Sequence, residues 1–154
     1  DTSCKQDNAQ TEEVTQDTSR FRRLLLAEDN MANQKLAVLL LKKIGYEVQV
    51  AVNGKEAVRA VLEGGFDAVL MDCQMPEMDG FEAAATIREY EKNTGRHLPI
   101  IAMTANAMQD DKEKCVQAGM DDYISKPINA KKLTEVMQLW VKPNLLWGKM
   151  LVLI

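Results

Sequence analysis

The 154-residue sequence is poor in aromatic residues, cysteine and histidine, and it contains no long apolar run. Aromatic side chains make up 5% of it, so aliphatic residues and methionine must fill any core. The longest apolar run near the end, Met150–Ile154, is far shorter than the roughly 20 residues of a membrane-spanning helix. The first residues also lack the apolar segment of a secretory signal. We therefore expect a globular domain without direct membrane insertion.

The cysteines Cys4, Cys73 and Cys115 form no CxxC motif and no cluster with the single histidine, His97. This pattern argues against a disulfide scaffold and indicates free, mostly buried thiols in a reducing compartment. We expect a cytoplasmic location, which a membrane-attached parent protein would also allow. Cys73 is predicted to be a packing residue, and His97 is predicted to lie solvated in a loop.

The formal net charge of −4 is concentrated at the start of the chain. Residues 1–19 contain several acidic side chains against Lys5 alone, while the remaining residues are balanced in charge. Beyond Arg20, Arg22 and Arg23 no basic stripe stands out. This distribution argues against direct binding of nucleic acid.

Composition divides the chain into three parts. Residues 1–20 are rich in Gln, Thr, Ser, Asp and Glu, which predicts a disordered linker or tail. Residues 21–141 are expected to form one folded domain. Residues 142–154 are a C-terminal tail whose role the sequence leaves open. A linker before a domain is typical of a domain that belongs to a longer protein.

Within the domain, short apolar runs alternate with segments whose apolar residues recur at helical spacing. The predicted strands are Arg23–Ala27, Tyr46–Val52, Phe66–Met71, Leu98–Met103 and Asp122–Ser125. The predicted helices cover 31–44, 54–63, 81–90, 106–118 and 129–141. This alternation predicts an α/β fold, with a doubly wound five-stranded parallel sheet that five helices cover on both faces.

Two predicted helices show their buried faces clearly. The first has apolar residues at Leu36, Ala37, Leu40, Leu41 and Ile44. The last has Leu133, Val136, Met137 and Trp140 at the spacing of one helical face. We expect these residues to pack on the sheet.

Acidic residues follow two of the predicted strands. Glu28 and Asp29 end the first strand, and Asp72 ends the third. In a doubly wound sheet, ligands bind at the carboxyl ends of the strands, so these side chains should meet there. Three neighbouring carboxylates repel one another, and hard oxygen ligands favour Mg²⁺. The alternative is that Asp29 or Asn30 merely caps the next helix.

Two further strands end in groups that suit a phosphate. Thr104 ends the fourth strand with a hydroxyl, and Lys126 follows the fifth with an ammonium group. Together with the acids they predict a site that handles phosphoryl groups. Asp72 stands alone on the central strand, so it is the predicted nucleophile.

These motifs closely resemble the receiver domain of two-component response regulators. The resemblance rests on Glu28-Asp29, the segment Met71–Gly80 around Asp72, Thr104-Ala105 and Lys126-Pro127. It covers residues 22–141 and implies the flavodoxin-like strand order 2-1-3-4-5. The combination is specific, whereas each motif alone would not be.

The resemblance implies phosphoryl transfer that depends on Mg²⁺. Asp72 would accept the phosphoryl group from a phosphohistidine on a partner, and Lys126 would pair with it. Asp29 and Asp72 would bind Mg²⁺ directly, and Glu28 would bind it through water. The backbone carbonyl of Gln74 would complete the protein ligands.

The resemblance also implies a conformational switch. Thr104 would move to hydrogen-bond the phosphoryl group, and the ring of Tyr123 would turn inward. The surface of the fourth helix, fifth strand and fifth helix would change as a result. The side chains of Gln74 and Asn106 would tune the phosphoryl lifetime by positioning or excluding water. The Lys126–Pro127 peptide would be cis.

Several assignments of the whole protein stay open. The sequence most resembles the receivers of hybrid sensor histidine kinases. A free-standing receiver and a protein-interaction module without phosphorylation are the alternatives. A flavodoxin-like cofactor binder is disfavoured, because this sequence has no phosphate-binding loop after the first strand.

The expected partners are a histidine kinase or a histidine phosphotransfer protein, docking near the first helix and the active-site loops. A glycine-rich nucleotide loop is missing, so we expect this chain to catalyse only its own phosphorylation and slow dephosphorylation. The oligomeric state is left open.

Overall fold

The computed structural model describes residues 22–105 and 109–141, with the side chains of 109 and 110 left aside. The predicted linker, the predicted C-terminal tail, Cys4 and Asn106 lie outside these described residues. The strands are β1 (Arg22–Ala27), β2 (Tyr46–Ala51), β3 (Ala68–Asp72), β4 (Ile100–Thr104) and β5 (Asp122–Ser125). The helices are α2 (Met31–Ile44), α3 (Gly54–Glu63), α4 (Gly80–Glu91), α5 (Gln109–Ala118) and α6 (Ala130–Trp140).

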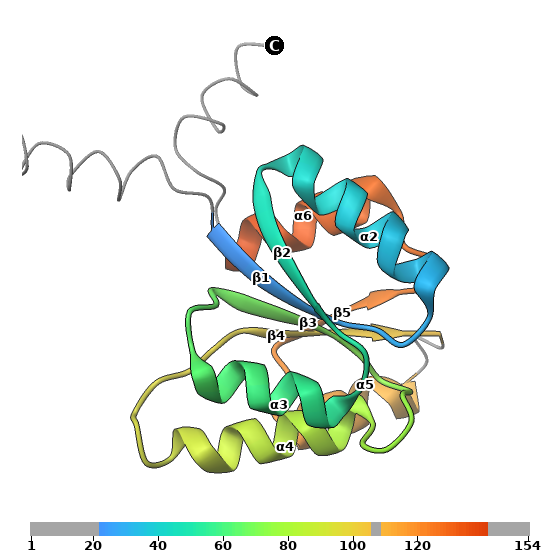
Figure 1. Cartoon of the computed structure of the whole chain (residues 1–154). Coiled ribbons are helices and arrows are strands. Elements are labelled where there is room, and N and C mark those ends of the chain that lie inside the picture. Colours follow the sequence, from blue (N-terminus) through green and yellow to red (C-terminus); the bar gives the residue numbers. More distant parts are fainter. Residues whose placement is uncertain (1–21, 106–108, 142–154) are drawn as a thin grey trace, which may run out of the picture.

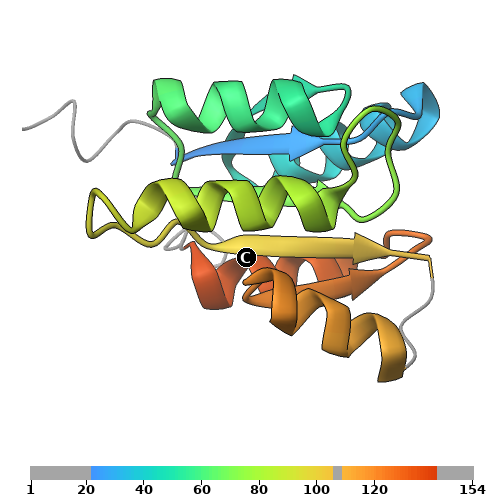
Figure 2. The ribbon, with the colours of Figure 1, turned by 90° about the horizontal axis from the view of Figure 1, so that it is seen from below.

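The described strands form one parallel five-stranded sheet in the order β2-β1-β3-β4-β5. Helices α2 and α6 cover one face, and α3, α4 and α5 cover the other (Figure 1). Figure 2 views the molecule from the side of α3, α4 and α5, and α4 lies between α3 and α5. The predicted α/β fold and strand order are confirmed. Within the described ranges, none of the helices has the length and apolar character needed to cross a bilayer.

Neighbouring residues of each strand face opposite helical layers. Leu25 and Val69 belong to the core beneath α3, α4 and α5, whereas Leu24 and Leu70 belong to the core beneath α2 and α6. All four are buried. Burial on both faces explains why the strands appear in the sequence as continuous apolar runs.

Two strands begin later than the sequence predicts. Phe66 and Asp67 precede β3 because they bind Arg23: its guanidinium lies 4.7 Å from the Phe66 ring centre, and its backbone N–H donates to Asp67 Oδ2 at 2.9 Å. Leu98 precedes β4 because its backbone N–H donates to the Glu91 carboxylate at 2.7 Å. At Leu98 a side-chain acceptor therefore replaces a ladder hydrogen bond, whereas the Asp67 N–H still donates to the Arg23 carbonyl at 2.7 Å.

Two of the predicted core residues lie at the surface. Leu36 of α2 is 41% exposed, while Ala37, Leu41 and Ile44 of the same helix are buried. Trp140 of α6 is 38% exposed, and its indole N–H donates to Asp122 Oδ2 at 2.9 Å. Helical spacing alone could not predict either case, because the limit of each buried stripe depends on the neighbouring elements.

Candidate active site

The sheet brings the predicted carboxylates to one edge. Ala27 of β1 pairs with Met71 of β3, so the residues that follow them, Glu28 and Asp72, leave the sheet side by side. One carboxylate oxygen from each of Glu28, Asp29 and Asp72 lies within 4.8 Å of the other two. The geometry therefore gathers the three acids that the sequence singled out.

Local hydrogen bonds fix Glu28 in a buried position. Its side chain is 1% exposed, and its Oε2 accepts the backbone N–H of Asn30 at 3.1 Å and the amide of Asn33 at 3.4 Å. Asn30 also caps α2, because its Oδ1 accepts the Asn33 N–H at 3.0 Å. The cap of α2 is thus made by Asn30, and Asp29 stays exposed beside the other two acids.

The second carboxylate oxygen of Glu28, Oε1, is also buried, but it has fewer partners than Oε2. Among the described residues, Oε1 of Glu28 accepts no hydrogen bond that meets normal geometry, and its close contact is an ion pair with Lys126 Nζ at 3.2 Å. One ammonium group cannot balance three carboxylates. A buried oxygen of this kind, within reach of two other carboxylates, fits a hard dication such as Mg²⁺.

Lys126 bridges the two buried acids. Its Nζ lies 2.9 Å from Asp72 Oδ2 and 3.2 Å from Glu28 Oε1. Partial burial alone would lower the pKa of Lys126, but the hydrogen bond to Asp72 and the charges of Asp72 and Glu28 outweigh it, so the pKa is raised.

The Lys126–Pro127 peptide is cis. The Lys126 N–H donates to the Thr104 carbonyl at 2.8 Å, which ties the ends of β4 and β5 together.

The loop after β3 holds Asp72 at the edge of the sheet. Asp72 is 4% exposed, and its Oδ1 accepts the backbone N–H of Gln74 at 3.1 Å. The Gly80 N–H donates to the Cys73 carbonyl at 3.1 Å. A Cβ at Gly80 would lie 2.2 Å from the Asp72 carbonyl oxygen, so a glycine is needed for this close approach. Gln74 itself points an exposed side chain outward, and its predicted role as a carbonyl ligand stays a prediction.

Thr104 ends β4 in a buried position beside the acids, and its hydroxyl is turned toward α5. Its Oγ1 donates to Oδ2 of Asp111 at 2.7 Å. Asp111 was not among the predicted site residues. The sequence offers one signal for it: Asp111 lies within the predicted helix 106–118 that follows Thr104. A pattern of apolar residues cannot show where such a carboxylate points.

Tyr123, the predicted aromatic switch residue, is half-buried on β5. Its ring packs against the core beneath α3, α4 and α5. The Lys112 ammonium group lies 5.2 Å from the ring centre. Tyr123 therefore touches the helix that also carries Asp111.

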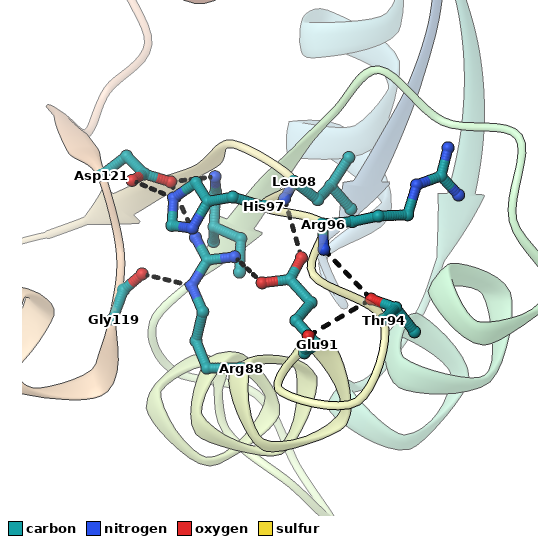
Figure 3. Close-up of polar contacts among 9 residues, drawn as sticks. Arg88, Glu91, Thr94, Arg96, His97, Leu98, Gly119 and Asp121 are labelled. Carbon is teal, nitrogen blue, oxygen red and sulfur yellow. Dashed lines mark hydrogen bonds and ion pairs between the residues drawn. The ribbon is translucent and has the colours of Figure 1, made fainter.

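His97 lies exposed in the loop before β4, as the sequence predicts, and it also joins a polar network at the opposite end of the sheet (Figure 3). Its Nε2 lies 2.7 Å from Asp121 Oδ1, and Arg88 Nη2 donates to Asp121 Oδ2 at 2.7 Å. Arg88 Nη1 also donates to Glu91 Oε1 at 2.6 Å. This network connects α4 to the segments that enter β4 and β5, and it lies away from the carboxylate site.

Comparison with known proteins agrees with this geometry. The family model for the response regulator receiver domain matches residues 24–138. The chain belongs to the response regulator receiver family. It is 49% identical over 121 residues to the hybrid signal transduction histidine kinase I of Dictyostelium discoideum, a match that covers 75% of this chain and 7% of that protein.

Solved receiver structures show the same fold. The receiver domain of sensor histidine kinase PA1611 from Pseudomonas aeruginosa PAO1, crystallised with magnesium in its active-site cleft, is 44% identical with a TM-score of 0.71, covering 77% of this chain and 96% of that one. A second match is the co-crystal structure of the Saccharomyces cerevisiae histidine phosphotransfer protein Ypd1 with the receiver domain of the response regulator Ssk1. That match has 37% identity and a TM-score of 0.73, and it covers 77% of this chain and 88% of that one. The predicted family is thereby confirmed, whereas the roles of individual residues remain predictions.

Proposed function

We propose that this receiver is the phosphoacceptor of a two-component phosphorelay and that Asp72 takes the phosphoryl group from a phosphohistidine on a partner. The observation that carries the proposal is the position of Asp72. Its carboxylate is buried at the end of the central strand, 2.9 Å from the Lys126 ammonium and beside Glu28 and Asp29. Glu28 shares this lysine and these neighbours, but of the two acids Asp72 is the one that ends the central strand of the sheet, β3.

The transfer requires one bond to form and one to break. An oxygen of Asp72 forms a bond to phosphorus, while the bond between phosphorus and the histidine nitrogen breaks and its electron pair stays on the imidazole. Lys126 balances the negative charge of the phosphoryl group as a point charge. The Thr104 hydroxyl supplies a hydrogen-bond donor to one of its oxygens.

We assign Mg²⁺ binding to Glu28, Asp29 and Asp72, with the backbone carbonyl of Gln74 as a further ligand. The buried Oε1 of Glu28, which lacks a normal hydrogen bond among the described residues, supports this assignment. Oxygen ligands in small number suit Mg²⁺, which keeps several waters. When bound, Mg²⁺ supplies charge stabilisation to the phosphoryl oxygens.

In the proposed switch, phosphorylation moves Thr104 toward the phosphoryl group and turns the Tyr123 ring inward. The surface formed by α5, β5 and α6 would change with them. Gln74 and Asn106 would set the lifetime of the phosphoryl group through their side chains. Catalysis by this chain would be limited to its own phosphorylation and slow dephosphorylation.

We further propose that the receiver is part of a hybrid sensor histidine kinase in the cytoplasm, with a histidine phosphotransfer protein as partner. The relatives support this: the chain spans 7% of the Dictyostelium hybrid kinase, and the Ssk1 receiver was crystallised with Ypd1. The described thiols, Cys73 and Cys115, are free, which suits a reducing compartment. A free-standing receiver is the alternative. The partner would dock near α2, where Met31 and Leu39 are exposed.

The test is intact mass after incubation with acetyl phosphate and Mg²⁺. We expect wild type to gain one phosphoryl group only when Mg²⁺ is present, and Asp72→Asn to gain none. Glu63→Gln, which alters an exposed acid at the end of α3, is the control and should behave as wild type. If wild type binds Mg²⁺ but gains no mass, the receiver selects its donor, and a phosphorylated histidine phosphotransfer protein replaces acetyl phosphate. Failure with both donors would favour an interaction module.

A further inference from the structure

The Thr104 hydroxyl has one proton to donate, and in this structure it donates that proton to α5. Oγ1 of Thr104 lies 2.7 Å from Oδ2 of Asp111. A carboxylate only accepts hydrogen bonds, so the threonine must be the donor in this pair. A phosphoryl group on Asp72 would also present only acceptor oxygens. The same proton cannot serve both acceptors at once.

We propose that Asp111 is a positioning residue that holds Thr104 in its resting orientation and competes with the phosphoryl group for the Thr104 hydroxyl. This inference rests on the proposed function, in which Thr104 turns toward phosphorylated Asp72. Each switching event would break the Thr104–Asp111 hydrogen bond and release the first turn of α5. Asp111 would thereby set how far the unphosphorylated state is favoured.

The residues near Asp111 on α5 indicate which other side chains would move when the Thr104–Asp111 hydrogen bond breaks. Lys112, the next residue, places its ammonium 5.2 Å from the ring centre of Tyr123, so movement of this turn alters the surroundings of that ring. One turn further along α5, Cys115 belongs to the same buried core as Cys73, the residue after Asp72. Both thiols are buried. Packing in this core would hold the middle of α5 while its first turn moves.

The experiment measures binding of beryllium trifluoride, a phosphoryl mimic, to the full chain with saturating Mg²⁺, using the fluorine NMR signal of the bound form. We expect Asp111→Ala to lower the half-saturating concentration by about three- to tenfold, because a competing hydrogen bond of ordinary strength is removed. The Mg²⁺ affinity measured without beryllium trifluoride should stay the same. Glu113→Ala removes an exposed acid from the same helix and should leave both quantities unchanged.

A double-mutant cycle separates positioning from a general effect on α5. In a Thr104→Val background there is no hydroxyl to compete for, so adding Asp111→Ala should change the half-saturating concentration by less than about 1.5-fold. An equal shift in both backgrounds would overturn the inference, as would no shift in either. Asp111→Asn keeps the shape of the side chain and weakens the acceptor, and we expect a smaller shift in the same direction. Asp111→Asn replaces Asp111→Ala in the double-mutant cycle if Asp111→Ala does not fold.

The same data distinguish this inference from the proposed function. If wild type binds neither Mg²⁺ nor beryllium trifluoride, the proposed phosphoacceptor function fails, and the inference fails with it. If wild type binds both and the cycle shows no coupling between Thr104 and Asp111, only the inference fails.

Discussion

Replacing Lys126 by methionine tests the electrostatics of the site directly. Methionine keeps much of the side-chain length but removes the ammonium group that lies between Asp72 and Glu28. Both carboxylates are nearly fully buried, so they would be left close together without a cation. Removing one partner from a buried ion pair costs about 3–5 kcal/mol. Because the Lys126 side chain is 21% exposed, water compensates part of this loss, and we expect about 2–3 kcal/mol.

Urea or thermal unfolding in the absence of divalent cations measures this cost. For a domain of this size the melting temperature should fall by roughly 6–15 °C, since each kcal/mol corresponds to about 3–5 °C. Saturating Mg²⁺ should stabilise Lys126→Met more than wild type, because the metal site then contains three carboxylates without a competing ammonium group. The variant should therefore recover part of its stability when Mg²⁺ is added.

Lys92→Met is the matched control. Lys92 also forms an ion pair, at 3.2 Å from Glu89, but its side chain is 72% exposed. Surface pairs contribute about 0–1 kcal/mol, so this variant should unfold close to wild type and respond to Mg²⁺ as wild type does. The electrostatic reasoning would be refuted if both variants lost the same stability, or if Mg²⁺ stabilised Lys126→Met no more than wild type.

Three further outcomes follow from the structure. The pKa of Lys126 is raised above its usual 10.5, so the stabilisation of the fold by the charged Lys126 should be constant at neutral pH and should decline only above pH 10.5. The difference in unfolding free energy between wild type and Lys126→Met, measured against pH, checks this. Gly80→Ala should destabilise by roughly 1–3 kcal/mol in urea unfolding, since its Cβ would meet the Asp72 carbonyl oxygen; wild-type stability would contradict the contact. Burial raises the pKa of both Cys73 and Cys115, so iodoacetamide at pH 8 should label them only after unfolding, as peptide mass mapping would show.

The fold could be predicted from the sequence because its signals are local and repeated. Glycines that end helices, such as Gly45 with its left-handed backbone, and apolar runs that are buried on both faces mark each unit. The starts of β3 and β4 could not be placed, because Asp67 binds Arg23 of β1 and Leu98 binds the Glu91 side chain at the end of α4, contacts that the pattern of apolar residues does not show. Exposure of Leu36 depends likewise on neighbouring elements.

The candidate site could be predicted to a similar extent. Residues at strand ends are brought together by the topology itself, so Glu28, Asp72 and Lys126 were identifiable in advance. Asp111 was not identifiable, because it acts from the first turn of a helix toward Thr104, and only the packing of α5 on the sheet shows this contact. The side-chain tuning roles of Gln74 and Asn106 stay predictions.

The two ends of the sheet show why one acidic cluster is a site and the other is a structural network. At the network of Figure 3, both oxygens of Glu91 have partners, the Arg88 guanidinium at 2.6 Å and the Leu98 N–H at 2.7 Å. Asp121 is likewise bonded at each oxygen, to His97 at 2.7 Å and to Arg88 at 2.7 Å. At the other end, Glu28 keeps a buried oxygen that meets only Lys126 and no normal hydrogen-bond donor among the described residues. A buried carboxylate oxygen without its full set of partners is costly unless a ligand completes it. That incomplete partnering, more than the number of acids, is what favours the carboxyl end of the sheet as the proposed binding place of a cation and a phosphoryl group.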